Sequence, residues 1–215
     1  KKYKRIHHIK NFKLLGGEKA VKEPRRVALS LLFDCFSLNE IYKMNNACVN
    51  EFSKKEINLF YKMHTQSLNT PLCSSMGRIF DAISSFADIL HVQSYEGETG
   101  LLIEKYYDSN LKDAFLYEIN EKEIDLSLMI KEIINLKEKK LICTMFINMI
   151  INIIIDISNM YKTKSIILSG GVFQNKTLLE KLSKRLNFLK KDFYYTKKAP
   201  LNDSSISLGQ IYSQI

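Results

Sequence analysis

The sequence predicts an α/β fold with a high helical content. Near the carboxyl end, an apolar run at residues 165–168 leads into two glycines, an amphipathic stretch follows, and a second short apolar run lies at about 192–196. A strand, a helix and a second strand in this order form a parallel unit, and such units bind ligands at the carboxyl ends of their strands. Upstream, most apolar residues recur at helical spacing, which predicts a helical region.

We expect residues 1–215 to form one portion of a domain, divided into three regions. Residues 1–20 should hold a partial strand segment, which the glycine pair Gly16–Gly17 interrupts. Residues 21–162 should be mainly helical, and residues 163–215 should form the α/β unit, which would bind the ligand.

Helix signals are strong in the middle region. Pro24 suits the first turn of a helix because its missing N–H is not needed there, and Ser53 followed by Glu56 predicts a capping box. The apolar spacing predicts helices at residues 24–33, 54–64, 77–91, 96–107, 126–135 and 140–161, and a strand at 114–119.

The α/β unit should alternate between strands and helices. The short apolar run at 165–168 is typical of a buried strand, and the alternation then predicts a helix at about 175–188. A second strand at about 192–196 and a terminal helix at about 203–213 complete the unit.

The composition indicates a folded, basic protein. Hydrophobic residues make up 46% of the 215 residues, which is enough for a substantial core, and the net charge is +9. Lysines are spread along the predicted helices as well as in pairs, so a solvated surface explains most of this charge, and attraction to an acidic partner or a nucleotide stays open. The sequence shows no nucleic-acid-binding motif, and we expect no nucleic-acid partner.

Cysteine usage and hydropathy favour the cytoplasm. The four cysteines are scattered without a Cys-x-x-Cys pair, which argues against a disulfide framework and a zinc ribbon. The longest apolar stretch, Met145–Ile157, is interrupted by polar residues and is shorter than the roughly 20 residues of a membrane span. We therefore expect a buried helix and no membrane contact. The basic amino end is not followed by an apolar segment, so no signal peptide is expected.

The glycines after the first predicted strand favour a nucleotide-binding bend. At Gly170 and Gly171 a Cβ atom would collide with a ligand lying on the loop, and the following helix would offer unpaired N–H groups. Asn175 can donate to and accept from the edge of a base. A tight turn for the glycines and a helix cap for Asn175 are the alternatives.

Three charged residues are further candidates for ligand contacts. Asp81 shares its predicted helix with six apolar residues, so if its face is buried it needs hydroxyl or cationic partners, and a ribose could supply the hydroxyls. Arg78 either contacts a phosphate or forms a surface ion pair. Asp203 precedes the terminal helix, where it either caps that helix or binds a metal or phosphate group. The histidines lack metal-ligand spacing, so a complete metal site is not expected.

Five ordered blocks cover nearly the whole chain: Tyr3–Arg26, Cys73–Ala82, Ser94–Glu98, Ser169–Asn175 and Asn202–Gln210. Together they resemble the carboxyl-terminal part of the HypF carbamoyltransferases of nickel–iron hydrogenase maturation. The resemblance implies the C-terminal lobe of an ASKHA (actin-like ATPase, Kae1-like) domain. This lobe would handle ATP as a carbamoyl-adenylate and pass the carbamoyl group to the C-terminal cysteine of a HypE-like protein.

The resemblance also implies roles for individual residues. The implied nucleotide-binding residues are Asp81, Gly100, Glu104, Gly170, Gly171 and Asn175, with Arg78 at a phosphate and Asp203 at a divalent metal of unassigned identity. We expect the glycine bend and Asp203 to face each other across a pocket for adenosine. The receiving thiolate belongs to the partner protein, so no catalytic side chain is expected in this chain.

The same resemblance implies further HypF modules as partners. The histidines that complete the metal site, together with acylphosphatase-like, zinc-finger-like and YrdC-like modules, would lie upstream of Lys1. We therefore expect this chain to be a fragment or an isolated lobe that is inactive by itself. Apolar surface left exposed where missing strands would pack predicts self-association.

Three positions depart from the family pattern. Ser204–Ser205 replaces two glycines after the Asn-Asp pair, which narrows the approach of a phosphate to the backbone. Ile147 replaces a histidine, and Cys73 stands where threonine is common. A reactive thiol at Cys73 stays open.

Two other functions remain as alternatives. One is the tRNA threonylcarbamoyl-transfer subunit of the same superfamily, against which the blocks Glu23–Arg26 and Ser75–Arg78 speak. The other is a non-catalytic module that binds a partner protein and no nucleotide.

Overall fold

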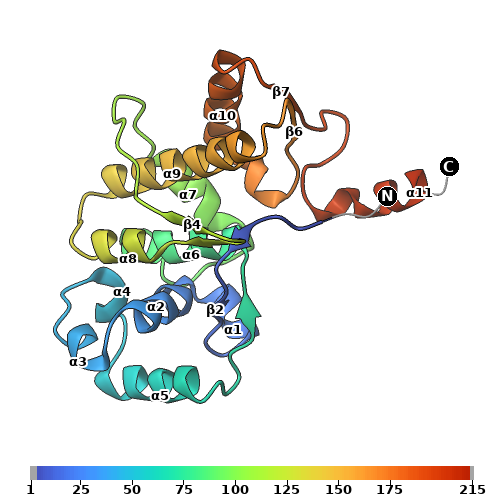
Figure 1. The fold of residues 1–215 in the computed structure, drawn as a ribbon. Helices are drawn as coiled ribbons and strands as arrows, with labels where there is room; N and C mark the ends of the chain where they lie inside the picture. Colours follow the sequence, from blue (N-terminus) through green and yellow to red (C-terminus); the bar gives the residue numbers. More distant parts are fainter. Residues whose placement is uncertain (1–3, 214–215) are drawn as a thin grey trace. The chain divides into compact units, whose positions relative to one another are not determined.

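The computed structural model describes residues 4–213 (Figure 1). Residues 1–3 of the predicted amino-terminal segment, Tyr3 of the first family block among them, lie outside the described part, as do residues 214–215. The chain divides into two compact units, Lys1–Phe146 (unit 1) and Ile147–Ile215 (unit 2), which are described separately. The predicted helix-rich α/β class is confirmed.

Unit 1 contains short strands that pair over long distances in the sequence. Strand β1 (His8–Ile9) runs parallel to β5 (Glu123–Asp125), which pairs antiparallel with β4 (Glu118–Asn120). Strand β2 (Phe12–Lys13) pairs antiparallel with β3 (Leu72–Cys73). These pairs hold the amino-terminal segment against elements that lie far downstream in the chain.

Helices make up most of unit 1. They are α1 (Glu18–Lys22), α2 (Pro24–Cys35), α3 (Leu38–Ile41), α4 (Ala47–Asn50), α5 (Lys54–Thr65), α6 (Met76–Phe86), α7 (Glu98–Lys105) and α8 (Ser127–Ile133). Helices α2 and α6 pack against each other, and both contribute fully buried residues to the core: Leu29 and Leu32 from α2, and Ile79 and Ile83 from α6. Helix α7 packs on α6.

The predicted capping box is confirmed at the start of α5. The Ser53 hydroxyl accepts a hydrogen bond from the N–H of Glu56, and the Glu56 carboxylate accepts one from the N–H of Ser53. An equivalent box at Ser37 and Glu40 begins α3.

Two predicted elements of unit 1 differ from the structure. Helix α6 ends at Phe86 and not at residue 91, because Asp88 has a φ of 53°, which no right-handed helix allows. The strand predicted at 114–119 forms only at its end, in β4. Its first residues have no strand partner, and the N–H of the buried Phe115 donates instead to the carbonyl of Met145.

Helix α9 (Lys139–Met160) is divided between the two units. With 22 residues and a mean hydropathy of 2.0 in its most apolar window, it is long and apolar enough to cross a membrane. The helix is therefore long enough for a membrane span, although the apolar stretch Met145–Ile157 was expected to be too short for one. Because 67% of that window is buried within the structure, the helix has the character of a core helix.

Unit 2 contains the predicted strand–helix–strand arrangement. Strand β6 (Ser165–Ile167) is followed by the 3₁₀ turn η1 (Gly171–Gln174), α10 (Lys176–Phe188), strand β7 (Asp192–Tyr194), the 3₁₀ turn η2 (Asp203–Ser205) and α11 (Ile206–Tyr212). Strands β6 and β7 are parallel, with Ile166 opposite Phe193. The parallel pair and its crossover helix are confirmed.

The prediction that the first strand of this unit is buried is wrong. Ile167 is 79% exposed and its neighbour Tyr194 is 59% exposed. The sheet has two strands, and α10, with Leu178, Leu182 and Leu186 buried along one side, packs against β7. Alternate residues of each strand therefore point away from the helix.

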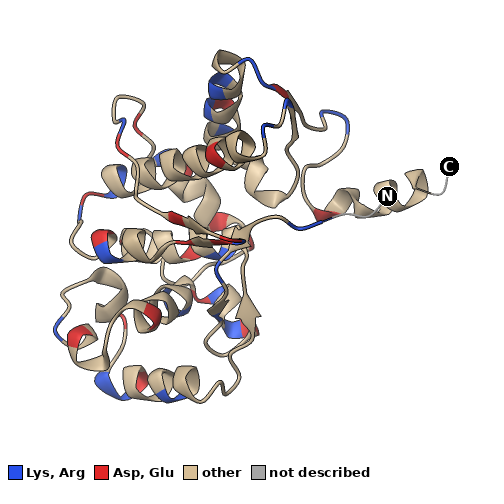
Figure 2. Ribbon diagram, viewed as in Figure 1, with Lys and Arg blue, Asp and Glu red and all other residues tan. Residues whose placement is uncertain are grey.

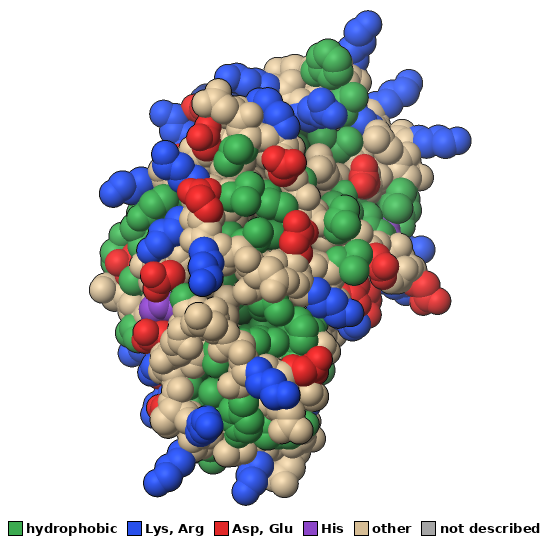
Figure 3. Space-filling view, turned by 90° about the vertical axis from the view of Figure 1, so that its left-hand side faces the viewer, with side chains coloured by type: hydrophobic (Ala, Val, Ile, Leu, Met, Phe, Trp, Pro, Cys, Tyr) green, Lys and Arg blue, Asp and Glu red, His purple; other side chains and the backbone are tan. Residues whose placement is uncertain are grey.

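The net charge is unevenly divided between the units, although basic residues are about equally frequent in both. Unit 2 holds ten lysines and arginines against four aspartates and glutamates. They follow α10 and the adjoining loops in the ribbon (Figure 2). On the face shown in Figure 3, basic side chains are scattered among acidic and apolar ones, as expected of a solvated surface.

Candidate functional site

The glycine bend of unit 2 has a backbone conformation that requires glycine. Gly170 has φ 110° and ψ 155°, a region that side-chain-bearing residues rarely adopt. Its N–H donates to the carbonyl of Leu201 at 2.8 Å, and a Cβ atom placed on Gly171 would lie 3.9 Å from Cβ of Asn202. The bend and the segment that precedes Asp203 therefore lie side by side. The adenosine pocket between them stays a prediction.

Asn175 caps helix α10. Asn175 is only 6% exposed, and its Oδ1 accepts a hydrogen bond from the N–H of Leu178 at 2.8 Å. The capping alternative is thus confirmed, while contact with a base edge stays a prediction. Helix α10 begins at Lys176, as predicted, and the 3₁₀ turn η1, which starts at Gly171, precedes it.

Asp203 is exposed at the first position of η2. The cap of this turn is Asn202, whose Oδ1 accepts from the N–H of Ser204 at 3.2 Å. The N-cap residue of the terminal helix α11 is Ser205, so the capping alternative for Asp203 is wrong. Within residues 4–213, no group of three His, Cys, Asp or Glu side chains could hold a metal. One carboxylate fits a cation such as Mg²⁺ only when phosphate oxygens and water supply the other ligands.

Asp81 and Arg78 form an internal ion pair in unit 1. The Asp81 residue is 1% exposed, Nη1 of Arg78 lies 2.6 Å from its Oδ2, and Thr99 Oγ1 donates to its Oδ1 at 2.8 Å. The buried carboxylate thus has a cation and a hydroxyl from the protein beside it, although Oδ2 accepts no hydrogen bond. Contact of either residue with a nucleotide stays a prediction, and in this arrangement the ion pair occupies both side chains.

Burial dominates the electrostatics of Asp81. Desolvation raises the pKa of this carboxyl to about 6, although the Arg78 charge and the Thr99 hydrogen bond lower it, and the Glu96 charge adds a smaller upward contribution. A carboxylate with such a pKa is ionised at pH 7 and can accept the Thr99 hydrogen bond there.

Gly100 and Glu104 lie on α7, the helix that packs on α6. Nothing lies within 4 Å of the position that a Cβ atom on Gly100 would occupy, and Glu104 is half-buried near the end of the helix. The predicted residues therefore fall into two groups. Asp81, Arg78, Gly100 and Glu104 are brought together in unit 1, and the bend and Asp203 in unit 2.

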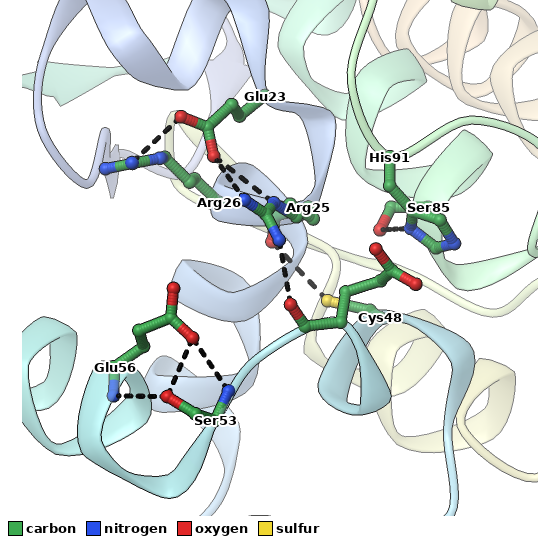
Figure 4. A network of polar contacts seen from close by, with 9 residues as sticks. Glu23, Arg25, Arg26, Cys48, Ser53, Glu56, Ser85 and His91 are labelled. Atoms are coloured by element: carbon green, nitrogen blue, oxygen red, sulfur yellow. Dashed lines mark hydrogen bonds and ion pairs between the residues drawn. The ribbon is translucent and has the colours of Figure 1, made fainter.

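The motif Glu23–Arg26, which the sequence singled out without a role, forms a network at the start of α2 (Figure 4). The Glu23 carboxylate pairs with Arg25 at 2.9 Å and with Arg26 at 2.8 Å. The two guanidinium groups lie over the rings of Phe52 and Phe60, at 4.8 and 4.7 Å from the ring centres. The motif therefore ties α2 to the segment that leads into α5 and to α5 itself.

The same network fixes the ionisation of its members. Burial raises the pKa of Glu23, but the hydrogen bonds and charges of the two arginines outweigh it and leave the pKa below its usual value. Close by in Figure 4, Cys48 Sγ donates to the Arg25 carbonyl, and burial raises the pKa of this thiol to about 12. Cys48 is thus an unreactive core thiol.

Sequence reasoning missed Thr99. Its partner Asp81 is 18 positions earlier, on another helix, so no local spacing pointed to the contact. Two cavities of about 170 and 470 Å³ also lie in unit 1, and their linings include none of the predicted nucleotide residues.

Known proteins give a consistent match. The family model described as "Carbamoyltransferase, Kae1-like Domain, second subdomain" matches residues 1–210. The carbamoyltransferase HypF of Synechocystis is 31% identical over 99% of this chain and 30% of its own length. The carbamoyltransferase HypF of Rhizobium leguminosarum is 25% identical over 97% of this chain and 28% of its own length. The chain thus spans about 30% of the length of these relatives.

Solved structures agree. A full-length HypF, crystallised in a phosphate- and nucleotide-bound form, superposes with a TM-score of 0.86 at 30% identity, over 98% of this chain and 34% of that protein. The HypF of T. kodakarensis shows the same fold, with a TM-score of 0.79 at 21% identity over 98% of this chain and 30% of that protein. The chain belongs to the HypF carbamoyltransferase family, as the second subdomain of the Kae1-like domain.

Proposed function

We propose that this chain is the nucleotide-binding lobe of a carbamoyltransferase. The whole protein would form a carbamoyl-adenylate from ATP and transfer the carbamoyl group to the C-terminal cysteine thiolate of a HypE-like protein. The lobe would require the remaining HypF modules for catalysis, in the cytoplasm. Family membership and the nucleotide-bound form of the related full-length HypF support this proposal.

The observation that carries it is the open bend at Gly170–Gly171 beside the 201–203 segment. An adenosine would lie on the bare backbone of the bend, at the carboxyl end of β6, where parallel units bind their ligands.

Asp203 would hold a divalent cation together with the phosphate oxygens of the nucleotide. That cation would neutralise phosphate charge. The chain itself would contribute positioning and charge stabilisation and no nucleophile, because the attacking thiolate comes from the partner.

The experiment compares ATP binding by wild type, Gly171→Val and Gly209→Val in isothermal titration calorimetry. A side chain at Gly171 meets only ordinary contacts, so the fold should persist while the space for adenosine is filled. Gly209, in α11 of the same unit, has open space around it and serves as the control. We expect ATP binding to be lost in Gly171→Val alone; equal binding by both variants would contradict the placement of the base.

A second function, a lobe that binds a partner protein without nucleotide, would be favoured by exposed apolar residues such as Ile167. Calorimetry separates the two: the absence of ATP binding together with binding of a HypE-like protein would support the second function.

A further inference from the structure

A cavity of about 170 Å³ in unit 1 has no role in the proposed function. Parts of the chain that are far apart in the sequence line it: the turn between β1 and β2, the end of α2, helix α6, and the segment from β5 into α8. Pockets for drug-sized ligands begin at roughly 300 Å³, so this cavity is too small for a nucleotide. It is therefore a separate candidate site for a much smaller ligand.

The floor of the cavity belongs to the hydrophobic core of unit 1. The apolar residues of the lining are buried, among them Leu31 (7% exposed), Ile79 (0%) and Ile130 (1%). In another protein, an engineered cavity of about 150 Å³ with a lining of this kind stays free of water and binds benzene. The floor therefore suits an apolar group of about the size of a benzene ring.

Polar side chains lie at the mouth of the cavity. The polar residues of the lining are exposed or half-buried, in contrast to the apolar ones. They are Lys10, Asn11, Asp34, Cys35, Asp125 and Ser127. An apolar floor with a few polar groups at its edge is the usual composition of a small-molecule site.

The protein itself already satisfies Asp125. Its Oδ2 accepts a hydrogen bond from Nζ of Lys10 at 2.6 Å, and its Oδ1 accepts from the N–H and the hydroxyl of Ser127. Burial raises the pKa of Asp125, but these hydrogen bonds outweigh it and leave the pKa below its usual value. Lys10 and Asp125 thus form a balanced pair of charges, and Lys10 is not free to bind an anionic ligand.

Asp34 gives the mouth its remaining charge. Its side chain is 41% exposed, and Oδ1 lies 3.1 Å from Nε2 of His64. A carboxylate has about four acceptor sites, so Asp34 can accept a further hydrogen bond from a ligand. With Lys10 and Asp125 in balance, the charge that a ligand meets at the mouth is negative.

We propose that this cavity is a binding site for a small amphipathic amine, with its apolar body on the core floor and its ammonium group at the Asp34 carboxylate. Such a ligand is complementary to both parts of the lining. An anion of the same size would meet Asp34 and find Lys10 already paired. The site is independent of the nucleotide, so its test does not depend on the proposed function.

The test titrates the 215-residue chain with three probes of nearly equal size: benzylammonium, benzyl alcohol and benzoate. The first readout is the set of amide chemical shifts at pH 7, measured by nuclear magnetic resonance. The second is the rate at which iodoacetamide alkylates Cys35 at pH 8, measured by mass spectrometry; burial raises the pKa of this thiol, so the reaction is slow. Cys73, a half-buried cysteine of unit 1 outside the lining, is the internal reference.

We expect benzylammonium to shift the amides of residues 9–12, 34–35 and 124–127. Its dissociation constant should be about 1 mM, because only about eight non-hydrogen atoms contribute to binding. Benzyl alcohol should bind about threefold more weakly, since it lacks one partly exposed charge pair, and benzoate should bind most weakly. Saturating benzylammonium should slow the alkylation of Cys35 and leave that of Cys73 unchanged.

Two pairs of variants locate the binding. Cys35→Phe fills the mouth and should abolish binding of benzylammonium and benzyl alcohol, whereas Cys73→Phe makes the same change outside the lining and should preserve it. Asp34→Asn keeps the shape of the cavity and should give both probes equal affinity. Asp88→Asn is its control, because Asp88 is another exposed aspartate beside a histidine, His91, and this variant should keep the threefold preference.

Three results would overturn the inference. The first is that no probe binds, or that the shifts lie outside the lining. The second is that saturating benzylammonium leaves the alkylation of Cys35 unchanged. The third is that benzoate binds as tightly as benzylammonium, or that Asp34→Asn keeps the preference for benzylammonium, which would refute the amine. If Cys35→Phe does not fold, Asp34→Asn and the alkylation rates decide.

Discussion

Replacing Asp81 by asparagine should change how the stability of the chain depends on pH. Burial raises the pKa of this carboxyl from 3.8 to about 6 in the folded state. Between these two values the folded state binds more protons than the unfolded state, so the free energy of unfolding falls as the pH rises through this window. An asparagine side chain does not titrate, so the Asp81→Asn variant lacks this component.

The magnitude follows from the size of the shift. Roughly two pKa units at about 1.4 kcal/mol each give a loss of about 3 kcal/mol in wild type between pH 4 and pH 7. The assay is urea unfolding followed by circular dichroism at pH 4, 5, 6 and 7, with the difference between wild type and Asp81→Asn taken at each pH. All other titrating groups cancel in this difference.

We expect wild type to lose about 3 kcal/mol relative to Asp81→Asn as the pH rises from 4 to 7. A constant difference, or one that favours wild type increasingly at higher pH, would show that the Arg78 ion pair outweighs desolvation. That result would refute the raised pKa.

Four further outcomes are expected. Asn175→Ala should lower the free energy of unfolding by about 1 kcal/mol in thermal melts, with Asn175→Asp nearly neutral, because the Leu178 N–H loses its acceptor only in the first variant. Glu23→Ala should cost about 3 kcal/mol in urea unfolding because two half-buried arginines lose their partner; a cost below about 1 kcal/mol would contradict the network. Asp203→Asn should weaken ATP binding with Mg²⁺ but not without it, whereas Asp192→Asn, an exposed acid of the same unit, should change neither; equal loss in both variants would refute the assignment. Ile167→Lys should reduce the molecular mass measured by light scattering if this exposed residue drives self-association, and an unchanged mass would argue against it.

Local chemistry explains which elements were predictable. The capping box at Ser53 and the apolar spacing of α5 lie within a few residues of each other, so the sequence alone predicts the helix. The parallel pair of unit 2 was predictable because two apolar runs and one amphipathic run follow in sequence.

The elements that were missed depend on distant partners. Strand β1 has two residues and exists because β5, more than 100 positions later, lies beside it. Helix α6 ends because Asp88 has a positive φ, and no glycine or proline near this position indicated that end in the sequence. The exposure of Ile167 was missed because an apolar run does not reveal how many strands a sheet has.

The candidate site shows the same division. The adjacency of the Gly170–Gly171 bend and the 201–203 segment was predictable from two motifs at the ends of successive strands. The pairing of Arg78 with Asp81 was also predictable from the sequence, because residues three apart share one face of a helix. The Thr99 contact was not, since it joins two helices.

The central claim is that ATP binds at the Gly170–Gly171 bend of unit 2. The most direct measurement is an amide nuclear magnetic resonance titration of the 215-residue chain with ATP. We predict that the shifts concentrate in residues 170–175 and 201–204. Shifts confined instead to the lining of the unit 1 cavity around Lys10, Cys35 and Ser127 would contradict the account.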